Sequence, residues 1–138
     1  MDSTAIWGFL HDGSLDRIDG VVPGDVTLHT SIPYLRKAFE PVGDGFIIRL
    51  IGCGQFDLTG DNGSVISDLD QIAARSLDIL SIESWSPLSI YTTDGTLILS
   101  YESLEIALDT GQPLTATELV QANAQYWQAW SERHGSGA

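Results

Sequence analysis

The clearest alternation of apolar and polar residues lies between Asp25 and Asp57, where it predicts two neighbouring strands. Residues 26–32 alternate between an apolar and a polar face, the period of two that is typical of a strand with one buried face. In residues 46–51 both faces are apolar except at Arg49. A strand that is apolar on both faces belongs inside a sheet, so we expect these two segments to form the central hairpin of an antiparallel sheet.

Apolar runs bounded by turn residues predict further strands on either side of this hairpin. These runs cover residues 4–10, 14–22, 78–85, 88–93 and 96 onward. The pair Asp94-Gly95 predicts a two-residue hairpin turn, because both residues tolerate positive φ angles. In the last run the apolar residues change face near Ser103, which predicts a bulge or a turn that divides it into two strands.

Two helices are predicted, a short one near residues 67–76 and a longer one at residues 115–133. Ser67 is in the N-cap position of the first helix. In the second, Thr115 and Glu118 have the spacing of a capping box, in which each side chain binds the backbone N–H of the other residue. An apolar stripe that is expected to cover one face of the sheet comprises Leu119, Ala122, Tyr126 and Trp130.

These elements predict an α+β domain that is mainly antiparallel β-sheet, with about six to eight strands and the two helices packed against them. A sandwich or a partly open barrel is the variant arrangement. We expect the domain to span residues 1–134, followed by a tail at residues 135–138. A chain of 138 residues buries roughly 65–70% of its unfolded surface on folding, so one core suffices. The single Cys53 cannot form an internal disulfide.

Acidic side chains outnumber basic ones by 19 to 6, which gives a formal charge of −13. Residues 57–132 contain twelve acids and one base, Arg75, so this segment carries 1 − 12 = −11. A negative surface repels phosphates and anionic lipids, so we expect a basic protein partner and neither nucleic acid nor membrane. The alternative is that the charge only keeps the protein soluble. Without a long apolar run or a basic N-terminus, a cytoplasmic location is expected.

The residues that we predict to bind the partner are exposed side chains of the acidic second half and of the last helix. They are Asp94, Glu102, Glu105, Asp109 and Trp127. In the last strands, alternation places Glu102, Glu105 and Asp109 opposite the apolar residues and therefore towards solvent. Trp127 lies beside the apolar stripe and is expected to be partly exposed.

No catalytic, cofactor or metal-binding signature is recognised in the sequence. His11 and Asp12 are one pair without a second histidine at ligand spacing, and Cys53 has no recognisable catalytic partner. We therefore expect no cofactor and no enzymatic activity. The adjacent bases Arg36 and Lys37 are expected to pair with the acidic second half, although an anionic ligand is the alternative.

Four segments of the chain, WGFLHDGSLDRIDG, PGDV, YLRKAF and YWQAW, together resemble the small cytoplasmic proteins, including immunity proteins, that accompany bacterial polymorphic toxins. The resemblance implies a compact acidic protein that neutralises a toxin or effector by protein–protein binding. Two other classes stay open. One is a structural or oligomerisation module. The other is a small-molecule binding protein or enzyme with a pocket in the sheet near His11, His29, Arg36 and Arg49.

Overall fold

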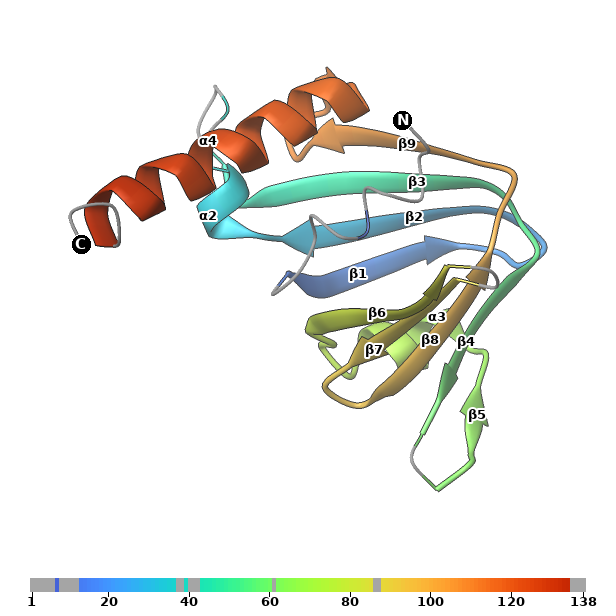
Figure 1. The fold of residues 1–138 in the computed structure, drawn as a ribbon. Helices are drawn as coiled ribbons and strands as arrows, with labels where there is room; N and C mark the ends of the chain where they lie inside the picture. The colour runs from blue at the N-terminus through green and yellow to red at the C-terminus, as the bar shows by residue number, and fades with distance from the viewer. Residues whose placement is uncertain are drawn as a thin grey trace.

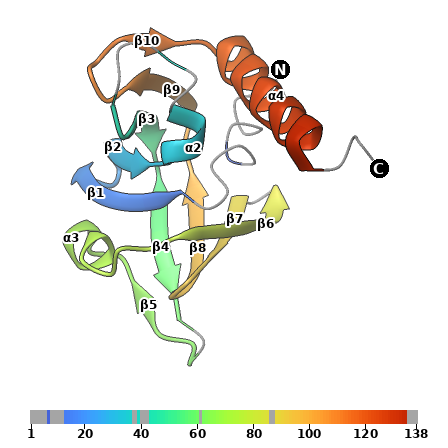
Figure 2. The ribbon, with the colours of Figure 1, turned by 90° about the vertical axis from the view of Figure 1, so that its left-hand side faces the viewer.

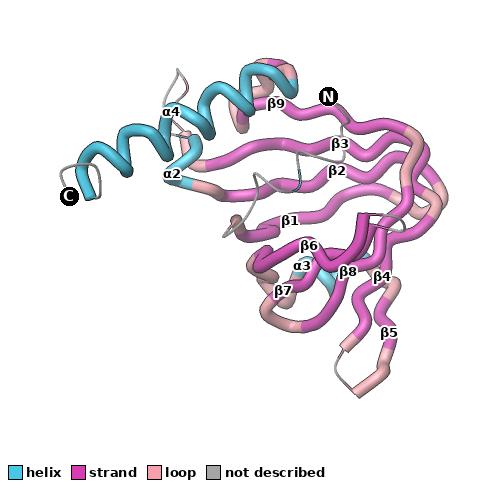
Figure 3. Tube along the Cα trace, viewed as in Figure 1, coloured by secondary structure: helices cyan, strands magenta, loops and turns pink. Residues whose placement is uncertain are grey.

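The computed structural model describes residues 7, 13–36, 39, 43–60, 62–85 and 88–134. Within this part of the chain, ten strands form two antiparallel sheets of five strands each. Figure 1 shows one sheet, with β1, β2, β3 and β9, above the other, with β4 to β8, and Figure 3 shows how much of the chain is strand. The predicted class, an α+β fold that is mainly antiparallel β-sheet, is confirmed.

Sheet A combines early and late strands of the chain, and sheet B is built from the strands between them. In spatial order, the strands of sheet A are β1 (Ser14–Gly20), β2 (Gly24–Ser31), β3 (Gly45–Cys53), β9 (Ser103–Leu108) and β10 (Pro113–Leu114). The strands of sheet B are β5 (Val65–Ile66), β4 (Gln55–Thr59), β8 (Gly95–Ser100), β7 (Leu88–Thr92) and β6 (Ile79–Trp85). The number of strands exceeds the predicted six to eight because long strands are divided between the sheets and because β5 and β10 have two residues each.

The predicted central hairpin is confirmed in sheet A. Strands β2 and β3 pair antiparallel with Val26 opposite Leu50 and Leu28 opposite Ile48. Strand β3 also pairs with β9, so it is the middle strand of the five. Its apolar residues on both faces agree with this central position.

Two strands bend sharply and continue from one sheet into the other. Strand β3 becomes β4 at Gly54, and β8 becomes β9 at Tyr101 and Glu102. The bends lie side by side, because the Gly54 N–H donates to the Ser100 carbonyl at 3.0 Å and the Glu102 N–H donates to the Ile51 carbonyl at 2.9 Å. The predicted division near Ser103 is therefore confirmed, and the bend joins the two sheets on one side of the molecule (Figure 1).

On the opposite side the first residues of β1 and β6 meet. The Leu15 N–H donates to the Leu77 carbonyl and the Ile79 N–H donates to the Gly13 carbonyl, both at 2.8 Å. This contact is a single bridge and not a continuous ladder, so the sheets do not close into a barrel.

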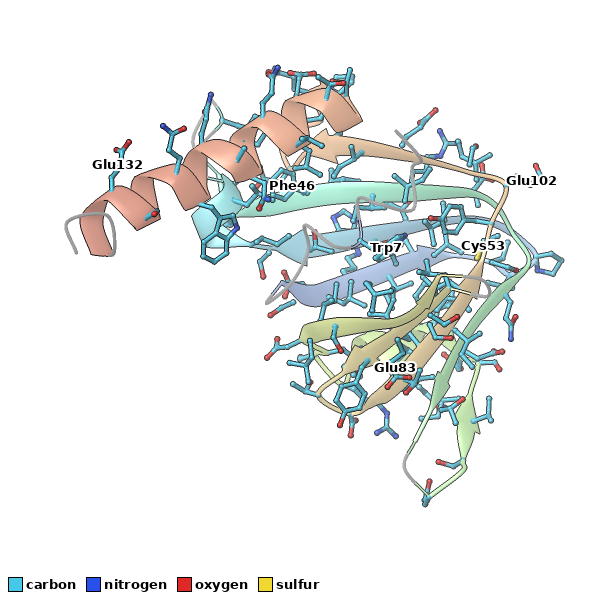
Figure 4. The ribbon with its side chains drawn as sticks, viewed as in Figure 1. Trp7, Phe46, Cys53, Glu83, Glu102 and Glu132 are labelled. Atoms are coloured by element: carbon cyan, nitrogen blue, oxygen red, sulfur yellow. The ribbon has the colours of Figure 1, made fainter. Side chains whose placement is uncertain are left out.

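The core lies between the sheets and is shared by them. Its largest fully buried apolar side chains are Trp7, Leu15, Leu28, Ile32, Leu35, Phe46, Ile48, Leu50, Phe56 and Leu58. Trp7, labelled in Figure 4, donates from its indole N–H at 2.9 Å to the hydroxyl of Tyr101, a residue of the bend between β8 and β9. Trp7 has helical backbone, so the strand predicted for residues 4–10 is wrong at this position. The rest of that run lies outside the described residues.

The short helix predicted near residues 67–76 is present as α3 (Leu69–Ala73), and Figure 2 shows it beside β1. Its N-cap is Asp68, whose side chain accepts from the N–H groups of Asp70 and Gln71. The predicted cap, Ser67, is one residue too early, because its hydroxyl donates to the Asp57 carboxylate instead.

The C-terminal helix is α4 (Ala116–His134), which lies next to the short helix α2 (Pro33–Arg36) and extends beyond the ends of the strands (Figures 1 and 2). The capping box is confirmed, because the Glu118 N–H donates to Thr115 Oγ1 at 3.1 Å and the Thr115 N–H donates to Glu118 Oε1 at 3.0 Å. Leu119 and Ala122 of the predicted stripe are buried. The side chains of its other members, Tyr126 and Trp130, lie outside the described part of the structure.

Candidate interaction surfaces

The five residues predicted to bind a partner lie on separate parts of the molecule. Asp94 is in the turn between β7 and β8 of sheet B, and Trp127 is on α4 with 48% of its surface exposed. The other three lie along strand β9 of sheet A. Glu102 immediately precedes the strand, in the bend from β8, Glu105 lies within it, and Asp109 immediately follows it. All five are exposed, yet Asp94 belongs to a different sheet from the β9 residues, so they do not form one continuous surface.

Asp109 has a structural partner, the fully buried Arg36. Arg36 Nη2 lies 2.8 Å from Asp109 Oδ1, and its Nε–H is shared between the same oxygen and the Gly45 carbonyl, each at 3.1 Å. The second oxygen, Asp109 Oδ2, accepts from the N–H groups of Asp44 and Gly45. The predicted pairing of Arg36 with the acidic second half is therefore confirmed, while Lys37 lies outside the described residues.

These contacts determine the protonation of Asp109. Desolvation raises the pKa of its carboxyl group, but the hydrogen bonds from Asp44, Arg36 and Gly45, together with the charge of Arg36, outweigh it and hold the pKa below its usual value. Asp109 is thus ionised at neutral pH, and both of its carboxylate oxygens already accept hydrogen bonds within the chain. It ties the end of β9 to α2 and to the start of β3.

The outer face of sheet A, which points away from the core, carries side chains that pair with one another. Its charged contacts are Arg17–Asp19 at 2.8 Å, His29–Asp19 at 3.5 Å, Arg49–Asp25 at 3.0 Å and Arg49–Glu105 at 3.9 Å. Thr27 lies in the middle of this face, between Asp19 on β1 and Arg49 on β3. The half-buried Ile47 and Ile51 lie among these polar groups, and the cationic groups of the face already have anionic neighbours.

The four residues that were the alternative candidates for a pocket do not converge. His29 and Arg49 lie on the outer face of sheet A, whereas Arg36 is buried and bound to Asp109. His11 is outside the described residues. The three positions that the structure describes therefore give no common site for a small molecule.

The outer face of sheet B has a different composition from that of sheet A. Strand pairing brings together eleven side chains, none of them fully buried: Gln55, Asp57, Thr59, Val65, Ser81, Ser84, Ser89, Tyr91, Thr96, Ile98 and Ser100. Six of the eleven are serine or threonine, and Asp57 is the only carboxylate among them.

Sequence reasoning missed this face for a physical reason. In β7 and β8 the polar positions alternate regularly, but β6 has two register shifts in its pairing with β7, between Ile79 and Ser81 and between Ile82 and Ser84. Each irregularity changes which residues share a face, so the serines of β6 cannot be assigned to it from the sequence. The alternating Ser89, Tyr91, Thr96 and Ile98 were the available signal.

Cys53 is buried at the end of β3, where its thiol lies 3.3 Å from the Gln55 carbonyl. Burial raises the pKa of this thiol, and the nearby Asp57 carboxylate acts in the same direction. A raised pKa and a buried position both lower the reactivity of a cysteine, because the thiolate is the nucleophile. Among the described residues there is no group of three or more His, Cys, Asp or Glu side chains arranged to hold a metal ion.

None of the helices in the described residues is sufficiently long and apolar to cross a membrane. Comparison of the chain with protein-family models, with curated proteins and with solved structures finds no match.

Proposed function

We propose that this chain is an acidic, non-catalytic binding protein of the immunity type, which inhibits a basic toxin or effector protein by covering part of its surface. The observation that supports this proposal most is that the described arginines are paired with carboxylates of the same chain. Each arginine whose side chain the structure describes, namely Arg17, Arg36, Arg49 and Arg75, contacts a carboxylate of the same chain. The acidic excess is therefore left for an external partner.

The carboxylates that remain are spread over the surface. Those that are exposed and have no ion pair within the described residues are Asp16, Asp44, Asp68, Asp70, Glu83, Glu102 and Glu118. Five of these seven follow residue 57, in agreement with the uneven charge of the sequence. Such a field raises the rate at which a basic protein associates and contributes less to the affinity of the final complex.

The test is to reverse carboxylates that have no ion pair within the described residues. Glu83→Lys combined with Glu102→Lys removes two unpaired carboxylates of the second half, whereas Asp94, Glu105 and Asp109 each contact an arginine and are poor choices. We expect the association rate with the partner to fall several-fold at low salt. The difference from the unmodified chain should shrink as the Debye length falls from about 30 Å at 0.01 M salt to about 10 Å at 0.1 M.

A matched control is Asp16→Lys with Asp44→Lys, which makes the same change in net charge in the first half of the chain. We expect a smaller change in association rate, because those residues lie outside the acidic half. The partner is obtained by pull-down from the native cell, and the rates are measured by surface-based kinetics at both salt concentrations. Rates that respond neither to salt nor to either pair of substitutions would show that the acidic surface serves solubility alone.

A further inference from the structure

We propose that the partner docks on the outer face of sheet B, and that it presents an uncharged, partly apolar centre surrounded by lysine and arginine side chains. This inference rests on the proposed function, since it names the surface that a basic partner would occupy. It follows from the charge of this face, from its exposed apolar groups and from its surroundings.

The first observation is the low charge of the face within a strongly acidic chain. The chain has 19 acidic residues, but Asp57 is the only one among the eleven side chains of this face. Asp57 already accepts hydrogen bonds from Ser67 Oγ at 2.6 Å and from Gln55 Nε2 at 3.0 Å. Covering the face therefore removes little charge from water, as in the centre of protein interfaces, where charged residues are depleted.

The second observation is the position of exposed apolar side chains. Among the described residues, the large hydrophobic side chains with the greatest exposure are Val21, Val65, Tyr91 and Trp127. Two of these four, Val65 at 60% and Tyr91 at 40%, lie on this face in one row across the sheet. Thr59 and Thr96 separate them, so the row spans three strand spacings, or about 15 Å. Tyrosine is enriched among the residues that contribute most to binding.

The third observation concerns the edges of the face. Glu83 is exposed on the edge strand β6 (Figure 4), and Asp94 is in the turn that joins β7 to β8. Arg75 pairs with Asp94 at 2.6 Å, which leaves the border acidic at Glu83, while Asp57 is a negative charge of the face itself. A second copy of this chain would bring like charges together at this border, whereas a basic border on the partner would be attracted.

The outer face of sheet A is a poorer docking surface by the same criteria. A partner there would cover two arginines and their carboxylates, Asp19, Asp25 and Glu105, which are now exposed to solvent. Removing water from ion pairs is costly unless the partner replaces their hydrogen bonds. Sheet A therefore provides a matched control surface within the same molecule.

The experiment uses the protein that the immobilised chain retains from native-cell extract at low salt and releases at high salt, identified and then purified. Its Kd is measured by calorimetry with the unmodified chain and with three variants. Thr96→Arg adds a long cationic side chain to the middle of the outer face of sheet B, and Tyr91→Ala removes its aromatic group. Thr27→Arg adds the same charge to the middle of the outer face of sheet A.

We expect Thr96→Arg to raise the Kd about 30-fold or more, the effect of losing a residue that dominates binding. Tyr91→Ala should raise it about 10-fold. Thr27→Arg should change it less than about 3-fold. Melting temperatures identify any variant that does not fold. If Thr96→Arg is unstable, Tyr91→Ala alone tests whether this face binds the partner, because the Tyr91 side chain is exposed and its removal should not unfold the protein.

Three results would overturn the inference, and they have different meanings. Unchanged affinity in Thr96→Arg and Tyr91→Ala would exclude this face and leave the proposed function intact. Retention of no basic protein would count against the proposed function itself. Sedimentation as a dimer that Thr96→Arg dissociates would assign the face to a second copy of the chain.

Discussion

A buried arginine that depends on one carboxylate makes Asp109 the most sensitive charged position in the described structure. Asp109→Asn keeps the shape of the side chain but leaves the Arg36 charge uncompensated inside the protein. We expect the free energy of unfolding to fall by about 3 kcal/mol, the lower end for a broken buried pair, because Asp109 itself is partly exposed. The measurement is urea denaturation at pH 7.

Glu105 provides the control for this substitution, since it is on the same strand and its contact with the exposed Arg49 is longer, at 3.9 Å. Glu105→Gln should change the free energy of unfolding by less than about 1 kcal/mol, as is usual for surface ion pairs. Equal effects of the two substitutions would show that Arg36 is stabilised mainly by its backbone carbonyl contacts.

The stability that Asp109 provides should also depend on pH. Its pKa is lowered by folding, so the unfolded chain takes up this proton first as the pH falls. The contribution is complete above the unfolded pKa of about 3.9 and is lost as the pH falls through the lower folded pKa. We therefore expect the difference in unfolding free energy between the unmodified chain and Asp109→Asn to be constant from pH 7 to about pH 5 and to shrink below about pH 4. A difference that grows in acid would contradict the assignment.

At the scale of elements, the side chains of α4 that the structure describes as buried, Leu119 and Ala122, lie in the N-terminal half of the helix. Leu119 is fully buried there, whereas Trp127, two turns later, is 48% exposed. We expect Leu119→Ala to lower the free energy of unfolding by about 2–5 kcal/mol, since it leaves a cavity in the core. Trp127→Ala should lower the free energy of unfolding by a smaller amount. Thermal denaturation of both variants measures the difference between them. A larger loss from Trp127→Ala would show that the outer part of the helix is the part that anchors it.

The sequence was sufficient to predict most of the longer elements but not their distribution between two sheets. The hairpins of β2 with β3 and of β7 with β8, and the capping box at Thr115, depend on neighbouring residues, so local patterns reveal them. The turn between β7 and β8 is formed by Thr93 and Asp94, one residue earlier than predicted, and of the predicted pair Asp94-Gly95 only Gly95 has a positive φ. The bend at Gly54, where β3 of sheet A continues as β4 of sheet B, depends on the residues that β3 and β4 each pack against. An alternating strand has the same pattern in either sheet, which is why one sheet was expected.

The candidate surfaces were less predictable than the fold for the same reason. Exposure of Glu102, Glu105 and Asp109 follows from alternation and is confirmed. Their distance from Asp94 follows from the order of strands in the sheets, which no local pattern specifies. The contact of Arg36 with Asp109 joins residues 73 positions apart. The sequence predicted that Arg36 pairs with a carboxylate of the acidic half. It did not predict that this carboxylate is Asp109, which was expected to bind a partner.

At the scale of the whole molecule, the charge of −13 should make stability rise with salt. Repulsion among the carboxylates opposes the compact state, and salt screens it. Salt also weakens ion pairs, but those of Arg17, Arg49 and Arg75 are on the surface and are worth at most about 1 kcal/mol each. We therefore expect the melting temperature to increase by about 3–6 °C between about 0.01 M and 0.15 M NaCl, as for a gain of about 1 kcal/mol.

The charge-reversed chain with Glu83→Lys and Glu102→Lys shows whether repulsion causes this increase. Each substitution adds two positive units, so the net charge changes from −13 to −13 + 4 = −9. Because these two carboxylates have no ion pair among the described residues, their reversal removes repulsion without breaking a native contact of that kind. The melting temperature of this variant at low salt should be higher than that of the unmodified chain, and its rise with NaCl should be smaller. A melting temperature that falls with NaCl in both proteins would mean that ion pairs outweigh repulsion, and that the acidic excess is balanced within the folded chain and is not left for a basic partner.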